Sequence, residues 1–150
     1  MTSTAQLFSN IYDKALIRYQ NKQEGREKFP ELTAREEHYL DILYGLGKTS
    51  PSDFSKKAKI SRPAATKIIQ SFLSKDYLIK TPSPSDGRVF YIQLTPEMET
   101  YRRQSFELAD RVFLDILQIL TKEEQDQLHQ LFEKVNKSLE GEEDDEPKKD

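Results

Sequence analysis

Residues 61–95 read SRPAATKIIQSFLSKDYLIKTPSPSDGRVFYIQLT, and a helical pattern changes to a strand pattern within this stretch. After Ser61, which can cap a helix, apolar residues recur at i, i+3, i+4, i+7 and i+8. They are Ala65, Ile68, Ile69, Phe72 and Leu73. Residues 77–81 and 89–94 are rich in β-formers, and the Pro-, Ser- and Gly-rich segment 82–87 separates them. The stretch therefore predicts an amphipathic helix followed at once by a β-hairpin.

A second, shorter helix is predicted directly upstream. Ser50 and Pro51 have the pattern of a capping residue followed by proline at the first helical position. Phe54 and Ala58 then face inward, and Ile60 lies in the turn beyond. Two short helices separated by about three residues are typical of a helix-turn-helix. With the hairpin behind them, they predict a winged helix-turn-helix.

Longer helices are predicted on both sides of this unit. The first carries an apolar stripe made of Leu7, Phe8, Ile11, Tyr12, Ala15, Leu16 and Tyr19. Thr33 with Glu36 forms a capping box that opens the next helix, in which Tyr39, Leu40, Leu43 and Leu46 face inward. Thr95-Pro96 starts a long helix, and Thr121 with Glu124 starts the last one. The stripes on the first helix and the last two are wider than a small lobe can cover, so we expect a homodimer.

The expected fold is mainly α with a small β-hairpin wing, flanked by N- and C-terminal dimerisation helices. We expect residues 1–139 to form a single domain. About 33–96 would be the winged-helix lobe, and about 4–22 and 96–139 the dimerisation helices. The acidic tail 140–150 (EGEEDDEPKKD) has no apolar residue to bury, so we expect it to be disordered.

The amino-acid composition argues against several classes of function for this chain. The chain has no cysteine, which excludes disulfides and thiolate chemistry. There is no secretory signal pattern and no apolar run long enough for a membrane span, so we expect a cytoplasmic location. The only histidines, His38 and His129, lie in different predicted helices, so we expect no metal and no cofactor. Without a catalytic constellation or a glycine-rich phosphate loop, we do not expect an enzyme.

Charge is unevenly distributed along the chain. The whole chain has a formal net charge of -3, yet residues 48–90 carry nine basic and three acidic residues. The tail 140–150 carries seven acidic and two basic residues. The overall value therefore hides a basic middle segment with a net charge of +6. A local basic patch of this kind attracts polyanions such as nucleic acid.

The middle of the chain resembles the multiple-antibiotic-resistance regulator (MarR) family of winged-helix transcription factors over roughly residues 33–96. The most specific stretch is SDGRVFYIQLT, where Asp86, Arg88, Leu94 and Thr95 match the family's wing pattern. In SRPAATK, Thr66-Lys67 matches the start of its recognition helix. Two positions depart from the family: Asp76 stands where glycine is usual, and Lys80 where arginine is frequent. Asp76 can adopt the left-handed conformation that this turn requires.

The resemblance implies a DNA-binding surface. The recognition helix would present Arg62, Pro63, Thr66, Lys67 and Gln70 to the major groove, where such side chains bond base edges or phosphates. Arg88 would enter the minor groove, and Asp86 would stabilise the wing by an ion pair with it. Lysines are expected to contact phosphates: Lys56 and Lys80 first, with Lys57, Lys59 and Lys75 as further candidates.

The resemblance also implies a ligand pocket between the dimer helices and the lobe, for a small aromatic or amphipathic effector that releases the DNA. Its candidate lining residues are Phe8, Tyr12, Tyr19, Tyr39, Tyr44, Phe106 and Phe113, although core packing is an alternative role for each. We therefore expect a double-stranded DNA-binding transcriptional regulator, most simply a repressor that binds a pseudo-palindromic operator. The alternative is a winged-helix protein–protein interaction module, which predicts an acidic or apolar recognition face instead of a basic one.

Overall fold

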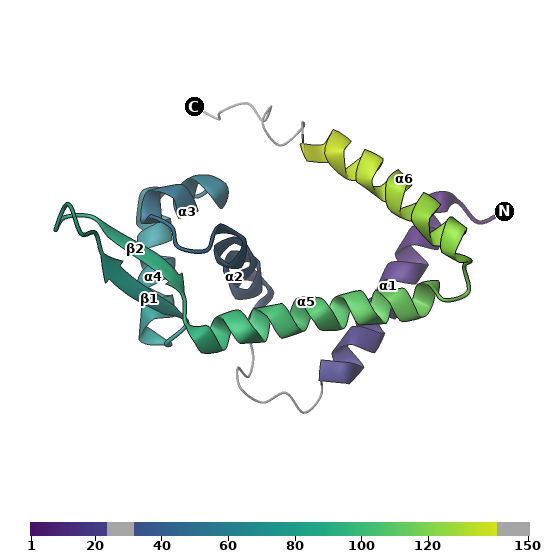
Figure 1. Ribbon diagram of the computed structural model, residues 1–150, viewed down its shortest axis with the longest axis horizontal. Coiled ribbons are helices and arrows are strands. Elements are labelled where there is room, and N and C mark those ends of the chain that lie inside the picture. Colours follow the sequence, from purple (N-terminus) through teal and green to yellow (C-terminus); the bar gives the residue numbers. More distant parts are fainter. Residues whose placement is uncertain (24–31, 141–150) are drawn as a thin grey trace. The chain divides into compact units, whose positions relative to one another are not determined.

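The computed structural model describes residues 1–23 and 32–140, which form helices joined by short connections and one β-hairpin (Figure 1). In chain order the elements are α1 (Thr4–Gln23), α2 (Ala34–Leu46), α3 (Pro51–Lys57), α4 (Arg62–Ser74), β1 (Leu78–Pro82), β2 (Phe90–Leu94), α5 (Pro96–Leu117) and α6 (Lys122–Glu140). The fold is mainly α with a small β-hairpin wing, which confirms the predicted fold class. None of the helices in this part of the chain is long and apolar enough to cross a bilayer.

The chain divides into two compact units. Residues 19–109 form the first, which we call the winged-helix lobe; residues 1–18 and the chain from Asp110 onward form the second, which we call the outer unit. Helix α5 runs from one unit into the other. That residues 1–139 act as a single domain stays a prediction. The predicted disorder of residues 140–150 falls outside the described residues, apart from Glu140, the last residue of α6.

Side-chain caps define where the helices of the lobe begin. Thr33 and Glu36 form the predicted capping box: the Thr33 Oγ1 accepts from the Glu36 backbone N–H at 3.1 Å, and the Thr33 N–H donates to the Glu36 carboxylate at 3.0 Å. Ser50 and Ser61 cap α3 and α4, each accepting from the backbone N–H three residues later. The two helices of the helix-turn-helix therefore start where the sequence predicts.

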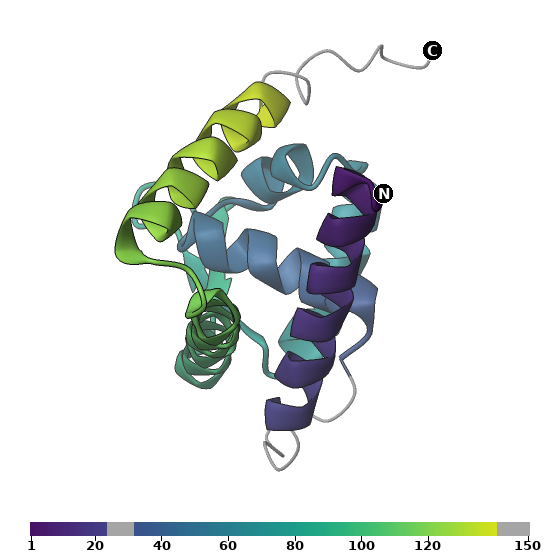
Figure 2. The same cartoon turned by 90° about the vertical axis from the view of Figure 1, so that its right-hand side faces the viewer.

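The core of the lobe is formed by α2, α3, α4, the start of α5 and both strands. Its buried residues are Tyr39, Leu40, Leu43, Phe54, Ala65, Ile69, Phe72, Leu78, Ile92, Leu94 and Met98. Phe54 of α3 and Phe72 of α4 are the largest side chains that are fully enclosed. Helices α2, α3 and α4 lie close together (Figures 1 and 2), and each of them contacts a strand of the hairpin. The inward-facing positions predicted for α2, α3 and α4 supply most of this core.

The wing is an antiparallel hairpin with a third, minimal partner. Leu78 pairs with Leu94 at the base, and Pro82 pairs with Phe90 near the tip. Thr49 adds an isolated bridge, donating to the Ile92 carbonyl at 2.9 Å and accepting from its N–H at 2.8 Å. The bridge attaches the α2–α3 connection to the sheet, a contact that the sequence pattern did not predict because a single bridged residue has no periodicity.

In the described part of the chain, two non-glycine residues adopt left-handed backbone conformations, and both flank α4. Asp76, with φ at 59°, follows α4 at the position where the sequence analysis expects this conformation. The Tyr77 N–H then donates to the Phe72 carbonyl at 2.8 Å, which closes the helix end. Lys59, with φ at 53°, lies in the α3–α4 turn and was not predicted. These residues fix the entry to α4 and the exit from it.

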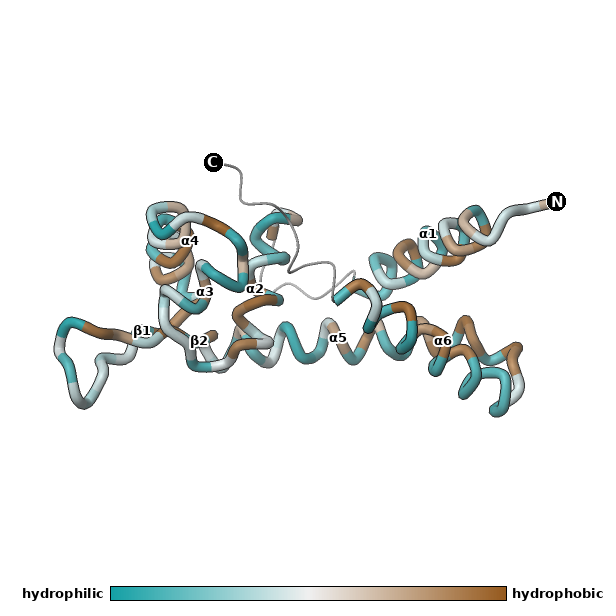
Figure 3. Tube along the Cα trace, turned by 90° about the horizontal axis from the view of Figure 1, so that it is seen from above, coloured by the Kyte–Doolittle hydropathy of each residue, from teal (hydrophilic) through white to brown (hydrophobic). Residues whose placement is uncertain are grey.

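In the outer unit, Val112 of α5 is buried, but the apolar side chains of α1 and α6 are largely uncovered. Neither α1 nor α6 has a buried residue. The exposed fraction is 61% for Phe8 of α1, and 60% and 56% for Leu131 and Val135 of α6. In Figure 3 brown and teal segments alternate along α6, as expected for a helix with one apolar face. The apolar stripes predicted on α1 and α6 are thus exposed in the single chain.

Candidate nucleic-acid interface

Helix α4 separates its packing residues from its polar residues. Ala65, Ile69 and Phe72 are buried against the lobe. Five exposed residues make up what we call the outer face of α4: Arg62, Pro63, Thr66, Lys67 and Gln70. The structure thus brings the five predicted recognition residues together on one solvent-facing surface. This surface holds two cations and no carboxylate, so it has neither the acidic nor the apolar character that the protein-interaction alternative predicts.

The wing tip is organised by hydrogen bonds to the backbone. The Asp86 Oδ1 accepts from the Arg88 backbone N–H at 3.0 Å, and the Val89 N–H donates to the Asp86 carbonyl at 3.1 Å. Within the described residues, Asp86 and Arg88 form no side-chain ion pair, which differs from the sequence expectation. Asp86 instead forms an Asx-turn, a motif that short carboxylates favour in tight loops. The Arg88 side chain is exposed, and no acidic side chain among residues 1–23 and 32–140 forms an ion pair with it.

The predicted phosphate-binding lysines have different surroundings. Lys56 and Lys57 are exposed at the end of α3. Lys80 is exposed on β1, and its Nζ lies 4.1 Å from the centroid of the Phe90 ring. This cation–π contact places the Lys80 charge over the wing while leaving it accessible. Lys48, which was not among the predicted contacts, makes a similar contact at 5.3 Å with the Tyr91 ring.

An ion pair links the end of α4 to the start of α2. Lys75, just after α4, donates to the Glu36 carboxylate in the capping box of α2. The hydrogen bond from Lys75 lowers the pKa of Glu36, and the hydrogen bonds from Thr33 lower it further. The same bond to Glu36 raises the pKa of Lys75. Lys75 is therefore better described as a positioning residue for α4 than as a free phosphate contact.

A second ionic contact fixes the start of α5 on α2. Arg102 is buried, and its guanidinium pairs with Asp41 and lies 3.9 Å from a Glu37 oxygen. It also lies 5.8 Å from the centroid of the Phe106 ring. Its Nε is buried and has no hydrogen-bond partner among the described residues. Sequence reasoning missed this pair and the Lys75–Glu36 pair. The partners lie 61 and 39 residues apart, beyond the reach of a local spacing rule.

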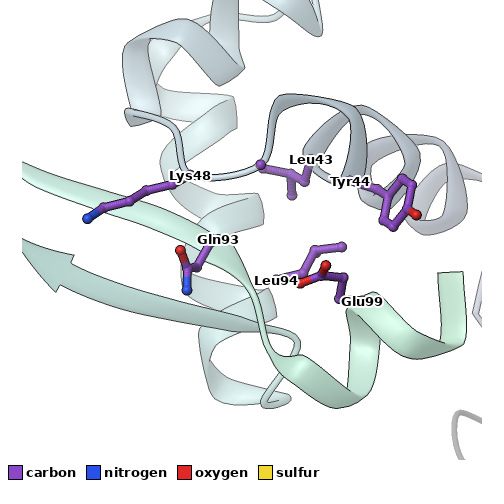
Figure 4. A pocket seen from close by; sticks show the side chains of 7 residues that line it. Leu43, Tyr44, Lys48, Gln93, Leu94 and Glu99 are labelled. Atoms are coloured by element: carbon purple, nitrogen blue, oxygen red, sulfur yellow. The ribbon is translucent and has the colours of Figure 1, made fainter. Parts of the chain in front are cut away.

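Two cavities in the described part of the lobe lie near the candidate site. One, of about 340 Å³, lies between α2 and α4 and is lined by Thr33, Arg35, Glu36, Tyr39, Ala64, Lys67, Ile68, Ser71 and Phe72. The other, of about 130 Å³, lies where α2 ends, β2 ends and α5 begins (Figure 4). Its lining is Leu43, Tyr44, Gly47, Lys48, Gln93, Leu94 and Glu99. Of the aromatic residues predicted to line a ligand pocket, Tyr39 and Tyr44 lie at these cavities. Tyr39 is also part of the core.

The two histidines lie in separate surroundings. The His38 ring is 5.6 Å from the Tyr39 ring, and the His129 Nε2 lies 3.7 Å from a Glu133 oxygen in the same helix. Across residues 1–23 and 32–140, the structure contains no group of three potential metal ligands.

Comparison with known proteins finds similarity over the central segment of the chain. The model of the MarR family matches residues 32–90. A curated relative, the transcriptional regulator AdcR of Streptococcus pyogenes serotype M6, is 31% identical over 90 residues. The match covers 57% of this chain, and the chain spans 60% of the length of that relative.

Solved structures share the fold of nearly the whole chain. The Streptococcus pneumoniae FabT structure in complex with DNA aligns with a TM-score of 0.69 at 20% identity, covering 90% of this chain and 93% of FabT. Staphylococcus aureus MepR bound to ethidium bromide aligns with the same score and identity, covering 92% of this chain and 97% of MepR. At this identity the likeness shows the winged helix-turn-helix fold. Over residues 32–90, the chain is similar to the MarR family.

Proposed function

We propose that this protein is a homodimeric regulator of transcription that binds double-stranded DNA in a sequence-specific manner. The main support for this proposal is the outer face of α4, where five exposed residues suit contacts to base edges and phosphates. The opposite face of the helix is buried in the core. An α-helix of this kind fits the major groove of B-DNA. The relatives support the same role: AdcR is a transcriptional regulator, and FabT was solved in complex with DNA.

Charge supports DNA as the ligand. Residues 48–90, with their net charge of +6, include α3, α4 and the wing. Lys56, Lys80 and Arg88 are exposed there, and the outer face of α4 adds Arg62 and Lys67. Contacts to phosphates position a protein on DNA, whereas contacts to base edges give specificity. We assign Lys56 and Lys80 to the phosphates, the outer face of α4 to the major groove, and Arg88 to the minor groove.

The outer unit supports a dimer. Exposed apolar side chains such as Phe8, Leu131 and Phe132 are costly in water, and a second copy would cover them. A symmetric dimer presents two copies of α4, which calls for a pseudo-palindromic operator with half-sites about one helical turn apart. Because the ligand is the cell's own DNA, we propose that the protein acts in the cytoplasm, as a regulator and not as an enzyme.

A small effector completes the proposed mechanism. The cavity between α2 and α4 is lined by the apolar side chains of Tyr39, Ile68 and Phe72, and also by Lys67 of the outer face. An aromatic or amphipathic molecule held there would change the surroundings of a DNA-contacting residue, so binding of effector and DNA would be coupled. MepR, which shares the fold, was solved with the aromatic cation ethidium. We therefore propose a repressor that such a ligand releases from DNA.

Alanine variants of Arg88, Arg62 and Lys67 test the proposal on an operator selected from random duplexes. Loss of a base contact typically weakens binding by about 1–3 kcal/mol and relaxes specificity at one position, whereas loss of a phosphate contact weakens binding to all sequences. We expect Arg88→Ala to weaken binding strongly, with fold and dimer intact by circular dichroism and sedimentation. Wild-type affinity should fall steeply with salt, since roughly 6–10 phosphate contacts are expected.

Lys134→Ala is the matched control, because Lys134 is an exposed cation on α6, outside the lobe. Its effect on operator affinity should be small. If all three lobe variants were folded, dimeric and unchanged in affinity and salt dependence, DNA binding through this surface would be wrong. The protein-interaction alternative would then take its place.

A further inference from the structure

Thr66 differs from its polar neighbours on the outer face of α4, because its hydrogen-bond donor is already used. Its hydroxyl donates to the Arg62 backbone carbonyl, with an oxygen–oxygen distance of 3.0 Å. This bond to the carbonyl four residues earlier is common for threonine in helices. The side chain is exposed, so its methyl group is the part left without a bonding partner at the surface.

A second apolar group lies beside this methyl group. Pro63 precedes Thr66 by three residues, a spacing that makes neighbours on a helix surface. Its ring is exposed and has no N–H to donate. Arg62 and Gln70 lie one turn to either side of Thr66, and Lys67 lies next to it. The outer face of α4 is therefore mainly polar, with one small apolar site, formed by Pro63 and Thr66, among charged and amide donors.

Only one group on the base edges of the major groove matches an apolar site. Guanine, cytosine and adenine present hydrogen-bond donors and acceptors there, whereas thymine also presents its 5-methyl group. Placing the apolar site against a donor or acceptor would bury that group without a partner, which costs free energy. Contact with a thymine methyl group avoids this cost and removes apolar surface from water.

We propose that Thr66 determines operator specificity by packing its methyl group, next to the Pro63 ring, against the 5-methyl group of one thymine in each half-site. The inference rests on the proposed function and specifies which chemical group of the DNA one residue reads. The competing role for Thr66 is that of a hydrogen-bond acceptor, since its oxygen keeps lone pairs that adenine or cytosine amino groups could reach. The two roles predict opposite behaviour for two conservative variants.

The experiment measures affinity for the selected operator after each half-site thymine is replaced, one position at a time, by deoxyuridine. This change removes one methyl group and leaves base pairing intact. For the wild type, we expect one position to lower affinity about fourfold per half-site, the value of one buried methyl group. Thr66→Val keeps a methyl group and should keep this loss. Thr66→Ser keeps the hydroxyl and should bind thymine and deoxyuridine duplexes equally.

Thr100→Ser is the matched control, because it removes a methyl group from α5 and should retain the full deoxyuridine effect. The proposal is wrong if no deoxyuridine position affects the wild type, or if Thr66→Ser remains sensitive while Thr66→Val does not. In both of these cases DNA binding itself still stands. If the wild type prefers no duplex sequence over any other, the proposed function fails, and this inference fails with it.

Discussion

The winged-helix lobe and the outer unit differ in how far their apolar side chains are buried. In the lobe, Phe54, Phe72 and Ile92 are almost completely shielded from solvent by other elements of the same lobe. In the outer unit, Phe8 and Leu131 each expose more than half of their surface. The two units have similar helical patterns in the sequence, yet only one of them has an enclosed core.

This contrast indicates where each unit obtains its stability. The lobe is closed by contacts within one chain, so its free energy of unfolding should depend little on protein concentration. The outer unit has few such contacts, and its apolar faces would be covered by a second chain in the proposed dimer. Its order should therefore depend on protein concentration, as in proteins whose folding is linked to association. Three predictions test this difference, from the largest expected effect to the smallest.

The largest effect is expected for Phe132→Ala on α6, where the Phe132 side chain is 43% exposed in the single chain. Burial of such a side chain contributes about 1.5–3 kcal/mol, and a symmetric interface contains it twice, so dimerisation should weaken by about 3–6 kcal/mol. Sedimentation at micromolar concentration should then show mainly the 17.5 kDa chain. Gln130→Ala, at an exposed polar position of α6, should leave the dimer intact. A wild type that sediments as a monomer would contradict the comparison itself.

The next effect concerns the lobe. Phe54→Ala removes a fully buried ring from the core, which typically lowers the free energy of unfolding by about 3–5 kcal/mol. Urea unfolding followed by circular dichroism measures the loss, which should not depend on protein concentration. Val89→Ala is the control, because Val89 is an apolar residue of the same lobe that is 40% exposed, and its loss should have little effect. Equal effects for the two variants would show that the lobe core is not closed.

The smallest effect is expected for Glu36→Gln, which removes the charge that joins the α2 capping box to Lys75. An exposed ion pair contributes about 0–1 kcal/mol. The pKa of Glu36 is lowered in the folded state, so its contribution is complete above the ordinary value of 4.5 and disappears as the pH falls through the lowered pKa. The stability difference between wild type and Glu36→Gln should therefore be constant near pH 7 and shrink in acid. A difference that grows in acid would contradict this assignment.

Local signals in the sequence predicted most of the lobe. The capping residues Thr33, Ser50 and Ser61 give the helix starts correctly, because a cap acts within three residues along the chain. Helical periodicity gives the buried face of α4 and, with it, the five residues of its outer face. Asp76 adopts the left-handed conformation that its place after the helix suggests. The predicted contacts of these residues with DNA stay predictions.

Contacts between residues far apart in the sequence could be identified only from the structure. The Thr49–Ile92 bridge, the Lys75–Glu36 pair and the buried Arg102 all join positions whose separation along the chain has no fixed rule. The wing shows the same limit over a short range, because Asp86 bonds the backbone of Arg88 and not its side chain. From the sequence alone, the Asp86 carboxylate could bond either the backbone N–H or the guanidinium of Arg88. The backbone path of the loop determines which of the two bonds forms.

The sequence by itself determined the order of elements, the helix caps and the two-faced pattern of α4, because these depend on neighbours within a turn or two of the chain. The tertiary structure decided which apolar stripes are covered. The stripes of α1 and α4 look alike as patterns, yet α4 buries its stripe and α1 has no buried residue. Burial depends on what the rest of the chain brings to a face, and periodicity along a single helix does not contain that information.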